Sequence, residues 1–170
     1  MADAPNETLA GKQAVLERLP DHPALKALLA WNADALSDAL FDRGELTVTV
    51  PSEKICEAVV TVKEAGYNAF EDMTAVDWLP NEPRFQLSYH ILSHQFKERI
   101  RIKTWVSSDD PAIESITSVW PGVNYYEREV FDLFGIRFDG HPNMRRIMMP
   151  RIGWDIRSAR TIRWRATDDG

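Results

Sequence analysis

Residues 84–106, RFQLSYHILSHQFKERIRIKTWV, hold two runs in which apolar and polar residues alternate. The first run covers residues 84–92 and the second covers residues 97–106, where Ile100, Ile102 and Val106 are in phase. Such alternation is typical of strands with one buried face, and the polar tripeptide Ser93-His94-Gln95 between the runs favours a turn. The stretch therefore predicts an antiparallel hairpin.

The residues before this hairpin predict a strand followed by a helix. Residues 45–50 alternate after Arg43-Gly44, which indicates a strand entered by a turn. Ser52 is a suitable helix cap, and Gly66 is placed to end the helix in the left-handed conformation. Three apolar residues between them follow helical spacing: Ile55, Val59 and Val62.

Three shorter helices are also expected. One contains Leu9, Val15, Leu16 and Leu19 and ends before Pro20, and the next begins near Pro23 and carries Leu25, Leu28 and Leu29 on one face. The third begins at Asp109-Asp110-Pro111. The order of helices, strands and hairpin predicts an α+β fold with two layers, a mixed β-sheet covered by helices, and an extended C-terminal segment.

Composition limits the function classes. The chain has 170 residues, 44% of them hydrophobic, and a formal net charge of -6, so one acidic globular domain is expected and nucleic acid is not an expected partner. The single Cys56 can form neither an internal disulfide nor a cysteine-based cluster, and a buried thiol is the simplest interpretation. No window approaches the roughly 18 apolar residues of a membrane span. We therefore expect membrane contact only through partners.

Residues 119–150, VWPGVNYYEREVFDLFGIRFDGHPNMRRIMMP, are dense in aromatic, charged and turn-forming residues. Asn124 and Glu127 have the spacing of a capping box, so a helix should begin there and end at Gly135. Tyr126, Val130, Leu133 and Phe134 would fall on one face, while Arg128 and Asp132 are spaced to pair on another.

The next stretch should turn and then expose two arginines. Asp139-Gly140 favours a turn, and Pro142 favours an extended conformation for His141, which we interpret as a turn residue. Arg145 and Arg146 would then be displayed on an exposed segment.

The stretch YEREVFDLFGIRFDGHPNMRRIMMP resembles the signature of the C-subunit, or 30 kDa-type subunit, of respiratory complex I, the proton-translocating NADH:quinone oxidoreductase. The similarity extends through DMTAVDWLP, RFQLSYHILS, RIRIKTWV and VWPGVNYYERE, and covers about residues 45–150. The resemblance implies a non-catalytic member of the hydrophilic arm that docks against the D-subunit, which builds the quinone pocket, on the cytoplasmic side of the bacterial inner membrane. It also implies no cofactor in this chain, with FMN and iron–sulfur clusters in partner subunits.

The resemblance places the partner interface on the signature itself. The residues expected there are Glu127, Arg128, Glu129, Asp132, Phe134, Gly135, His141, Pro142, Arg145 and Arg146. Three segments follow: an N-terminal helical segment at residues 1–44, the family's α+β domain at 45–150, and a divergent tail at 151–170. Six Trp residues are many for an acidic domain; most should lie in the core, and some of Trp78, Trp105 and Trp120 could anchor an interface.

The tail departs from the family, which continues with a segment resembling Gly-His-Pro-Leu-Arg-Lys-Asp-Tyr-Pro. Reading the codons one frame later from Gly153 permits Leu-Gly-His-Pro-Leu-Arg-Lys-Asp-Tyr-Pro, and Trp154 followed by Asp155 forces the glycine. We therefore hypothesise a frameshift before residues 151–170. Sequencing the encoding DNA tests it, because codons incompatible with the shifted reading would exclude it.

Other functions have weaker support in the residues. Glu127, Glu129 and Asp132 could be read as catalytic carboxylates, but neighbouring helix positions point in different directions. His90 and His94 have metal-ligand spacing only if helical, and here they flank a strand end. The Arg-rich tail, with Trp154 and Trp164, leaves single-stranded nucleic acid as a weak alternative, and a hydrolase lacks a recognisable motif. The nearest alternative is the same module in a membrane-bound hydrogenase or a ferredoxin- or deazaflavin-dependent dehydrogenase.

Overall fold

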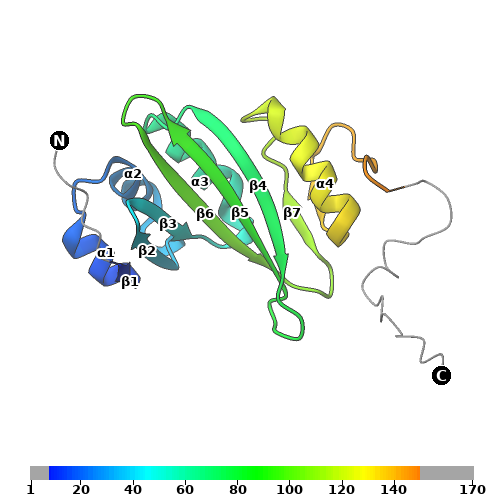
Figure 1. The fold of residues 1–170 in the computed structure, drawn as a ribbon, viewed down its shortest axis with the longest axis horizontal. Coiled ribbons are helices and arrows are strands. Elements are labelled where there is room, and N and C mark those ends of the chain that lie inside the picture. The colour runs from blue at the N-terminus through cyan, green and yellow to red at the C-terminus, as the bar shows by residue number, and fades with distance from the viewer. Residues whose placement is uncertain (1–7, 150–170) are drawn as a thin grey trace, which may run out of the picture.

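A computed structural model describes residues 8–149, and a mixed six-stranded sheet is its central element (Figure 1). The strand order is β1-β2-β3-β6-β5-β4. The strands are β1 (Leu9–Ala10), β2 (Asp38–Asp42), β3 (Glu45–Thr49), β4 (Ala69–Asp77), β5 (Phe85–Ser93) and β6 (Glu98–Val106). Within this sheet only β3 and β6 run parallel; the other neighbours are antiparallel. The predicted α+β fold is confirmed.

The predicted hairpin forms the centre of this sheet. β5 and β6 pair along their whole length, from Phe85 opposite Val106 to Ser93 opposite Glu98. The turn closes with a hydrogen bond from the Lys97 amide to the Ser93 carbonyl (2.9 Å). Because side chains alternate along each strand, this register brings Tyr89 and Ile102 to the same face of the sheet.

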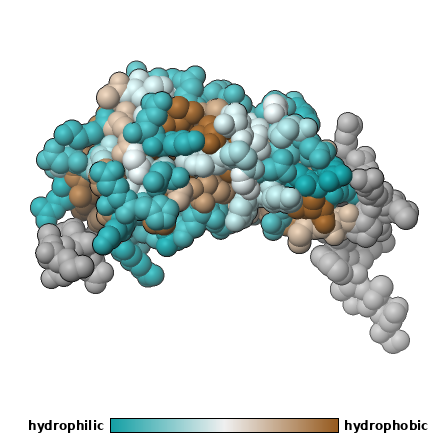
Figure 2. Space-filling view, turned by 90° about the horizontal axis from the view of Figure 1, so that it is seen from above, coloured by the Kyte–Doolittle hydropathy of each residue, from teal (hydrophilic) through white to brown (hydrophobic). Residues whose placement is uncertain are grey.

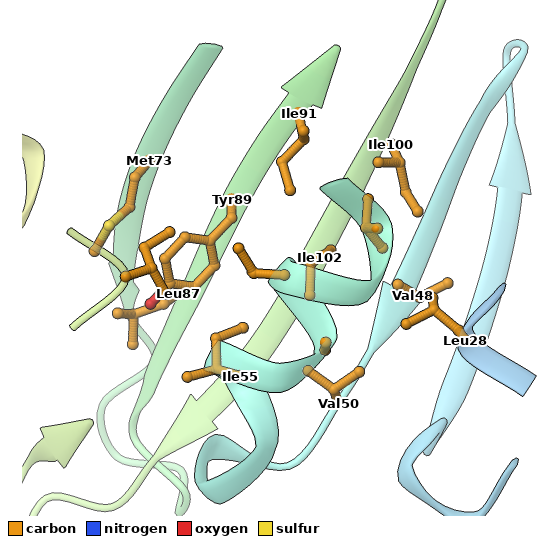
Figure 3. Packing of buried hydrophobic residues seen from close by; sticks show 14 of the residues in the cluster. Leu28, Val48, Val50, Ile55, Met73, Leu87, Tyr89, Ile91, Ile100 and Ile102 are labelled. Carbon is orange, nitrogen blue, oxygen red and sulfur yellow. The ribbon is translucent and has the colours of Figure 1, made fainter. Parts of the chain in front are cut away.

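Helices cover that face. They are α1 (Lys12–Arg18), α2 (Pro23–Asn32), α3 (Ile55–Glu64) and α4 (Asn124–Phe134), with single 3₁₀ turns at Ala33–Ala35, Ser52–Lys54 and Pro121–Val123. Figure 1 shows α3 behind the strands, and Figure 3 shows Ile55 of α3 directed at the sheet among Leu87, Tyr89 and Ile102. The core therefore lies between one face of the sheet and the helices.

Five strands were not predicted as they occur. Residues 109–114 were expected to begin a helix, which is wrong: Ala112–Glu114 is strand β7, paired in parallel with β8 (Arg137–Asp139). Pairing with β8 buries Ile113 and outweighs the local preference for a helix start after Asp109-Asp110-Pro111. Strands β1 and β2 lie within the segment expected to be helical, and β4 was not predicted.

The end of α3 depends on Gly66, as expected. The amides of Gly66 and Tyr67 donate to the carbonyls of Lys63 (3.1 Å) and Val62 (3.2 Å), which is the Schellman arrangement. Its beginning was predicted wrongly, since Ser52 makes no side-chain cap and a 3₁₀ turn at Ser52–Lys54 leads into the helix.

Replacing Gly66 by Ala should lower the free energy of unfolding by roughly 1–2 kcal/mol. Gly66 has φ +107°, which strains any side chain, and an added Cβ would lie 3.0 Å from Cε2 of Phe96. Gly122→Ala is the control, because a Cβ there meets nothing within 4 Å. Urea unfolding measures both variants, and equal stability would contradict the prediction.

Candidate partner-binding site

Helix α4 and residues 141–149 form the candidate site, and Glu127 is the first signature residue that departs from expectation. It does not cap α4, whose first residues make no side-chain cap. Its carboxylate is fully buried and accepts hydrogen bonds from Ser115 Oγ (2.6 Å) and the Ile116 amide (2.8 Å). The predicted capping box is therefore wrong, because Glu127 instead satisfies polar groups of the loop after β7.

His141 is held beside this carboxylate. Its imidazole is fully buried, with Nε2 3.3 Å from the Asn124 carbonyl and 3.9 Å from the Glu127 carboxylate. The Asn143 amide donates to Nδ1 (3.0 Å), so Nε2 carries the proton and donates to Asn124. Burial lowers the pKa of His141. His141 is thus both a turn residue and a link between the turn and α4.

Asp132 holds the segment that follows. One carboxylate oxygen accepts from the amides of Ile147 (3.0 Å), Met148 (2.7 Å) and Met149 (2.8 Å). The other oxygen lies 3.7 Å from Nε of Arg146. Successive amides around one carboxylate form an anion-binding concavity, here filled by a side chain of the same protein. Asp132 therefore fastens residues 146–149 to α4.

Arg128 adds a second attachment. Its Nε donates to the Arg145 carbonyl (3.0 Å), and its guanidinium lies over the Tyr125 ring, 5.7 Å from the centroid. Arg128 and Asp132 thus each bind the extended segment, so the predicted pairing between them is wrong. Arg146 is partly buried against Asp132 and is not displayed as expected, whereas Arg145 is exposed.

The remaining signature residues have separate positions. Gly135 ends α4 with φ 74°, as predicted, and Phe134 is half-buried with its ring 6.3 Å from that of Phe85. Glu129 and Pro142 are exposed. The structure therefore brings Glu127 and His141 into one buried cluster and Asp132 and Arg146 into another, while Glu129 and Arg145 remain at the surface.

Exposed apolar side chains accompany these charges. Tyr125 and Leu133 are 67% and 44% exposed on α4. Residues of the fastened segment lie beside it with similar exposure: Ile147 40%, Met148 60% and Met149 49%. We call these five residues the α4 surface. Figure 2 shows a hydrophobic area among hydrophilic surface at the end of the molecule that carries α4.

The α4 surface was not predicted. Leu133 was expected on one apolar face with Tyr126, Val130 and Phe134, but of these four residues only Val130 is buried. Tyr125 and Leu133 lie eight residues apart and so share a helix face with Glu129 between them. An 11-residue helix with six aromatic or aliphatic residues has more apolar side chains than one face can bury, and this excess was the available signal.

The alternative sites find no support within residues 8–149. No group of three or more metal-ligand side chains occurs in that range. His90 accepts a hydrogen bond from Arg101 Nε (2.8 Å), and His94 lies 3.0 Å from the Asn68 side chain. Among the four tryptophans in that range only Trp120 is buried, so the expectation that most tryptophans lie in the core is wrong; Trp78 is 45% exposed. Cys56 is half-buried, and burial raises the pKa of its thiol.

Glu127→Gln should change how stability depends on pH. Burial raises the pKa of Glu127 from 4.5 to about 7, so folding favours the protonated acid. The folded protein then binds more protons than the unfolded chain between pH 4.5 and about 7, and the stability of the wild type relative to Gln falls as pH rises through that window. At pH 8 the variant should be more stable by up to about 3 kcal/mol.

Comparing the stabilities of the two proteins at each pH separates the contribution of Glu127 from that of His141. The lowered pKa of His141 makes stability rise with pH, which is the opposite direction. Below pH 4.5 the two stabilities should be close. Urea unfolding at pH 4.5, 6 and 8 measures the difference, and a pH-independent difference would contradict the prediction.

Comparisons with known proteins decide the family. A family model described as respiratory-chain NADH dehydrogenase, 30 Kd subunit, matches residues 48–160. The chain belongs to this family. The match covers every strand from β4 to β8 and all of α4, so the candidate site lies on the part of the chain that defines the 30 kDa subunit family.

Two relatives in the family are C-subunits of NADH-quinone oxidoreductase. The NADH-quinone oxidoreductase C-subunit of Roseiflexus castenholzii is 43% identical over 134 residues, covering 76% of this chain and 77% of that protein. The protein of the same name from Geobacter sulfurreducens is 43% identical over 119 residues, covering 69% and 74%.

Two solved structures share the fold. The trypsin-resistant fragment of Nqo5 has a TM-score of 0.64 and 30% identity, covering 72% of this chain and 99% of the fragment. A chain of the membrane-bound sulfane sulfur reductase, an archaeal respiratory membrane complex, also has a TM-score of 0.64, with 28% identity and 75% and 73% coverage.

Proposed function

We propose that this chain is a structural subunit of NADH-quinone oxidoreductase, complex I, in the hydrophilic arm, and that the α4 surface docks it to a neighbouring subunit. The family match and the relatives named as C-subunits of this enzyme support membership of the complex. They favour this complex over the hydrogenase and the ferredoxin- or deazaflavin-dependent alternatives. Electron transfer from NADH to quinone, and the coupled proton translocation, would then be properties of the assembly.

The docking role rests on one observation: the charged residues of the signature bind other parts of this chain. Asp132 and Arg128 fasten residues 145–149 to α4, and this holds the exposed Met148 and Met149 against the helix that carries the exposed Leu133. Exposed apolar side chains that are held in a fixed arrangement by buried polar groups mark an interaction surface. Met and aromatic side chains are also common at the centres of protein interfaces.

The finer assignments belong to the same proposal. We propose that the docking partner is the D-subunit, which carries the quinone pocket, and that the chain itself is non-catalytic and holds no cofactor, while FMN and iron–sulfur clusters lie in partner subunits. We also place it peripherally on the cytoplasmic side of the bacterial inner membrane. Within residues 8–149, every helix is too short or too polar to span a membrane.

Leu133→Asp tests the docking role. The side chain is 44% exposed, so the isolated chain should fold, while a carboxylate at the α4 surface should lower recovery of the chain with the purified complex at least about tenfold. Val60→Asp is the control, because Val60 is a similarly exposed residue (36%) on α3, away from the α4 surface. NADH:quinone activity of the membranes should fall in parallel with the lost subunit.

Two results would overturn the proposal. One is full recovery of Leu133→Asp with the complex together with a folded isolated chain. The other is turnover of NADH or quinone by the isolated wild-type chain, which would contradict a non-catalytic role.

A further inference from the structure

The opposite face of the sheet has no helical cover among the described residues. Figure 1 looks onto this face, with α3 behind the strands. Core-facing residues such as Leu87, Tyr89 and Ile102 are fully buried, whereas Arg99 and Arg101 on the other face remain partly exposed. A sheet with one covered and one open face normally carries polar side chains on the open side. Most of this face agrees with that rule.

One end of the open face departs from it. Val76 of β4 and Trp105 of β6 both lie opposite Gln86 of β5, so they share the open face. Trp78 extends this row, with its ring 6.2 Å from that of Trp105. Val76, Trp78 and Leu79 are 42%, 45% and 64% exposed. We call Val76, Trp78, Leu79 and Trp105 the tryptophan patch.

The loop between β4 and β5, which carries Trp78 and Leu79 of the tryptophan patch, is held in place by side-chain contacts. Arg84 makes two hydrogen bonds to the Asp77 carboxylate (2.7 and 2.6 Å), and its guanidinium lies 4.8 Å from the centroid of the Phe85 ring. Glu82 accepts from the amides of Arg84 (3.1 Å) and Ser108 (3.3 Å). A fixed apolar surface loses little conformational entropy when it binds, so these contacts prepare the patch for a partner.

A row of bases on β6 leads to the tryptophan patch. Arg99 pairs with Glu45 (3.4 Å) and Glu71 (3.1 Å), and Arg101 pairs with Glu45 (3.1 Å). Lys103, the next residue on this face, has no ion pair or side-chain hydrogen bond with any residue in the described range. Only the neutral Thr49 and Ser88 lie opposite it on the adjacent strands.

The environment of Lys103 makes the lack of a counter-charge costly. The residue is half-buried, and burial together with the charge of Arg101 lowers its pKa. A carboxylate from outside would remove that cost, since a nearby opposite charge favours the ionised form. The two preceding bases already have carboxylate partners, so Lys103 is where an incoming acid would be recognised.

We propose that the open face carries a second protein-docking site, in which another subunit places an aliphatic side chain on the tryptophan patch and a carboxylate on Lys103. An acidic side chain beside an aliphatic one matches the surface in both charge and hydropathy. The site lies on the opposite face of the sheet from the helical layer that includes α4. This inference rests on the proposed function, because a second docking site gives the subunit two binding surfaces. With both surfaces the subunit can bridge two neighbouring subunits.

Nucleic acid and lipid fit the surface less well. Residues 76–84 and 107–110, which contain or closely follow the members of the tryptophan patch in the sequence, hold four acidic residues and one arginine. That charge opposes phosphate-bearing partners, for which several bases must converge. A protein partner needs only the single base that the face leaves unpaired.

A photo-cross-link tests the location. p-Benzoylphenylalanine replaces Val76 in the full chain, and the purified complex is irradiated and mapped by mass spectrometry. We expect a cross-link to another subunit at a segment where Asp or Glu lies within about four residues of Leu, Ile, Val or Met. The same probe at Leu133 is the positive control, and it reports on the α4 surface separately.

Four outcomes of this experiment would overturn the inference. They are no cross-link from Val76 while Leu133 yields one, a cross-link to a second copy of this chain, a cross-link to lipid or nucleic acid, and a cross-link to a subunit segment without an acid. If Leu133 fails and Val76 succeeds, the proposed docking role of α4 fails and the second site stands.

Charge reversal tests the chemistry. Lys103→Glu should lower retention of the chain in the complex at least about tenfold. Changing the cross-linked acid of the partner to Lys should restore it. Arg18→Glu is the matched control, because Arg18 is exposed on α1 and carries the same charge change. Unchanged retention of Lys103→Glu, or failure of the reversed pair to restore it, would overturn the inference.

Discussion

Asp132→Ala is expected to detach residues 146–149 from α4 and to remove the chain from its complex. The carboxylate accepts from three successive amides, and the substitution leaves all three without a partner. A hydrogen bond to a charged group contributes roughly 1.5–3 kcal/mol, so without the carboxylate the segment should open to water instead of staying in place. The free energy of this local opening should fall by about 3 kcal/mol, or about a hundredfold in the opening equilibrium.

Hydrogen exchange measures the opening directly. The amides of Ile147, Met148 and Met149 should lose protection about a hundredfold, while amides of β5 and β6 keep theirs. Recovery with the complex should fall as far as for Leu133→Asp, because the same surface is lost by a different route. Glu129→Ala is the control, since Glu129 is a nearby exposed acid on the same helix. Unchanged protection at residues 147–149 would contradict the role assigned to Asp132.

Ile102→Ala is expected to lower the free energy of unfolding by about 2–5 kcal/mol. Ile102 is fully buried in the middle of the sheet, between Val48 of β3 and Tyr89 of β5, and Figure 3 shows it beneath α3. The substitution removes three carbon atoms where close packing on all sides limits relaxation. Most of the cost is therefore the cavity and the lost contact area.

Lys103→Ala, at the next residue of β6, is the control, because it introduces the same alanine into the same strand without removing a core side chain. Its side chain lies on the open face, so the change in stability should stay under about 1 kcal/mol. Urea unfolding followed by tryptophan fluorescence measures both variants. Equal losses would show that the open face contributes as much to folding as the covered face, contrary to the observed packing.

The parts of the fold that were predictable have strong local periodicity. β5 and β6 alternate over nine residues each, and α3 has its apolar residues at helical spacing and a glycine at its end. Helix α4 was placed correctly for the same reason, with Gly135 as its end. β2, β4 and β7 were missed because their residues gain a strand conformation from pairing with a neighbour that the local pattern does not reveal.

The candidate site was predictable as a segment but not residue by residue. The signature pointed to α4 and residues 141–149, where the exposed apolar side chains lie. It did not reveal that Arg128, Asp132 and Glu127 act within the protein, because their partners lie up to 17 residues away in the chain. Residues 151–170, and with them the hypothesis of a shifted reading frame, lie outside the described part of the structure.

The amino-acid sequence alone determined the family, the α+β class, the central hairpin and the segment that carries the candidate site, because these depend on periodicity and motif, which are local. Tertiary structure decided which charges are internal fastenings and which are surface, that Leu133 faces solvent, and that Lys103 has no counter-charge in the described range while Arg99 and Arg101 do. The hydrogen-bond or ion-pair partner of each charged side chain depends on which strands and loops become neighbours in space. The free energy of a carboxylate or an ammonium is set by those neighbours, and no local pattern of residues encodes them.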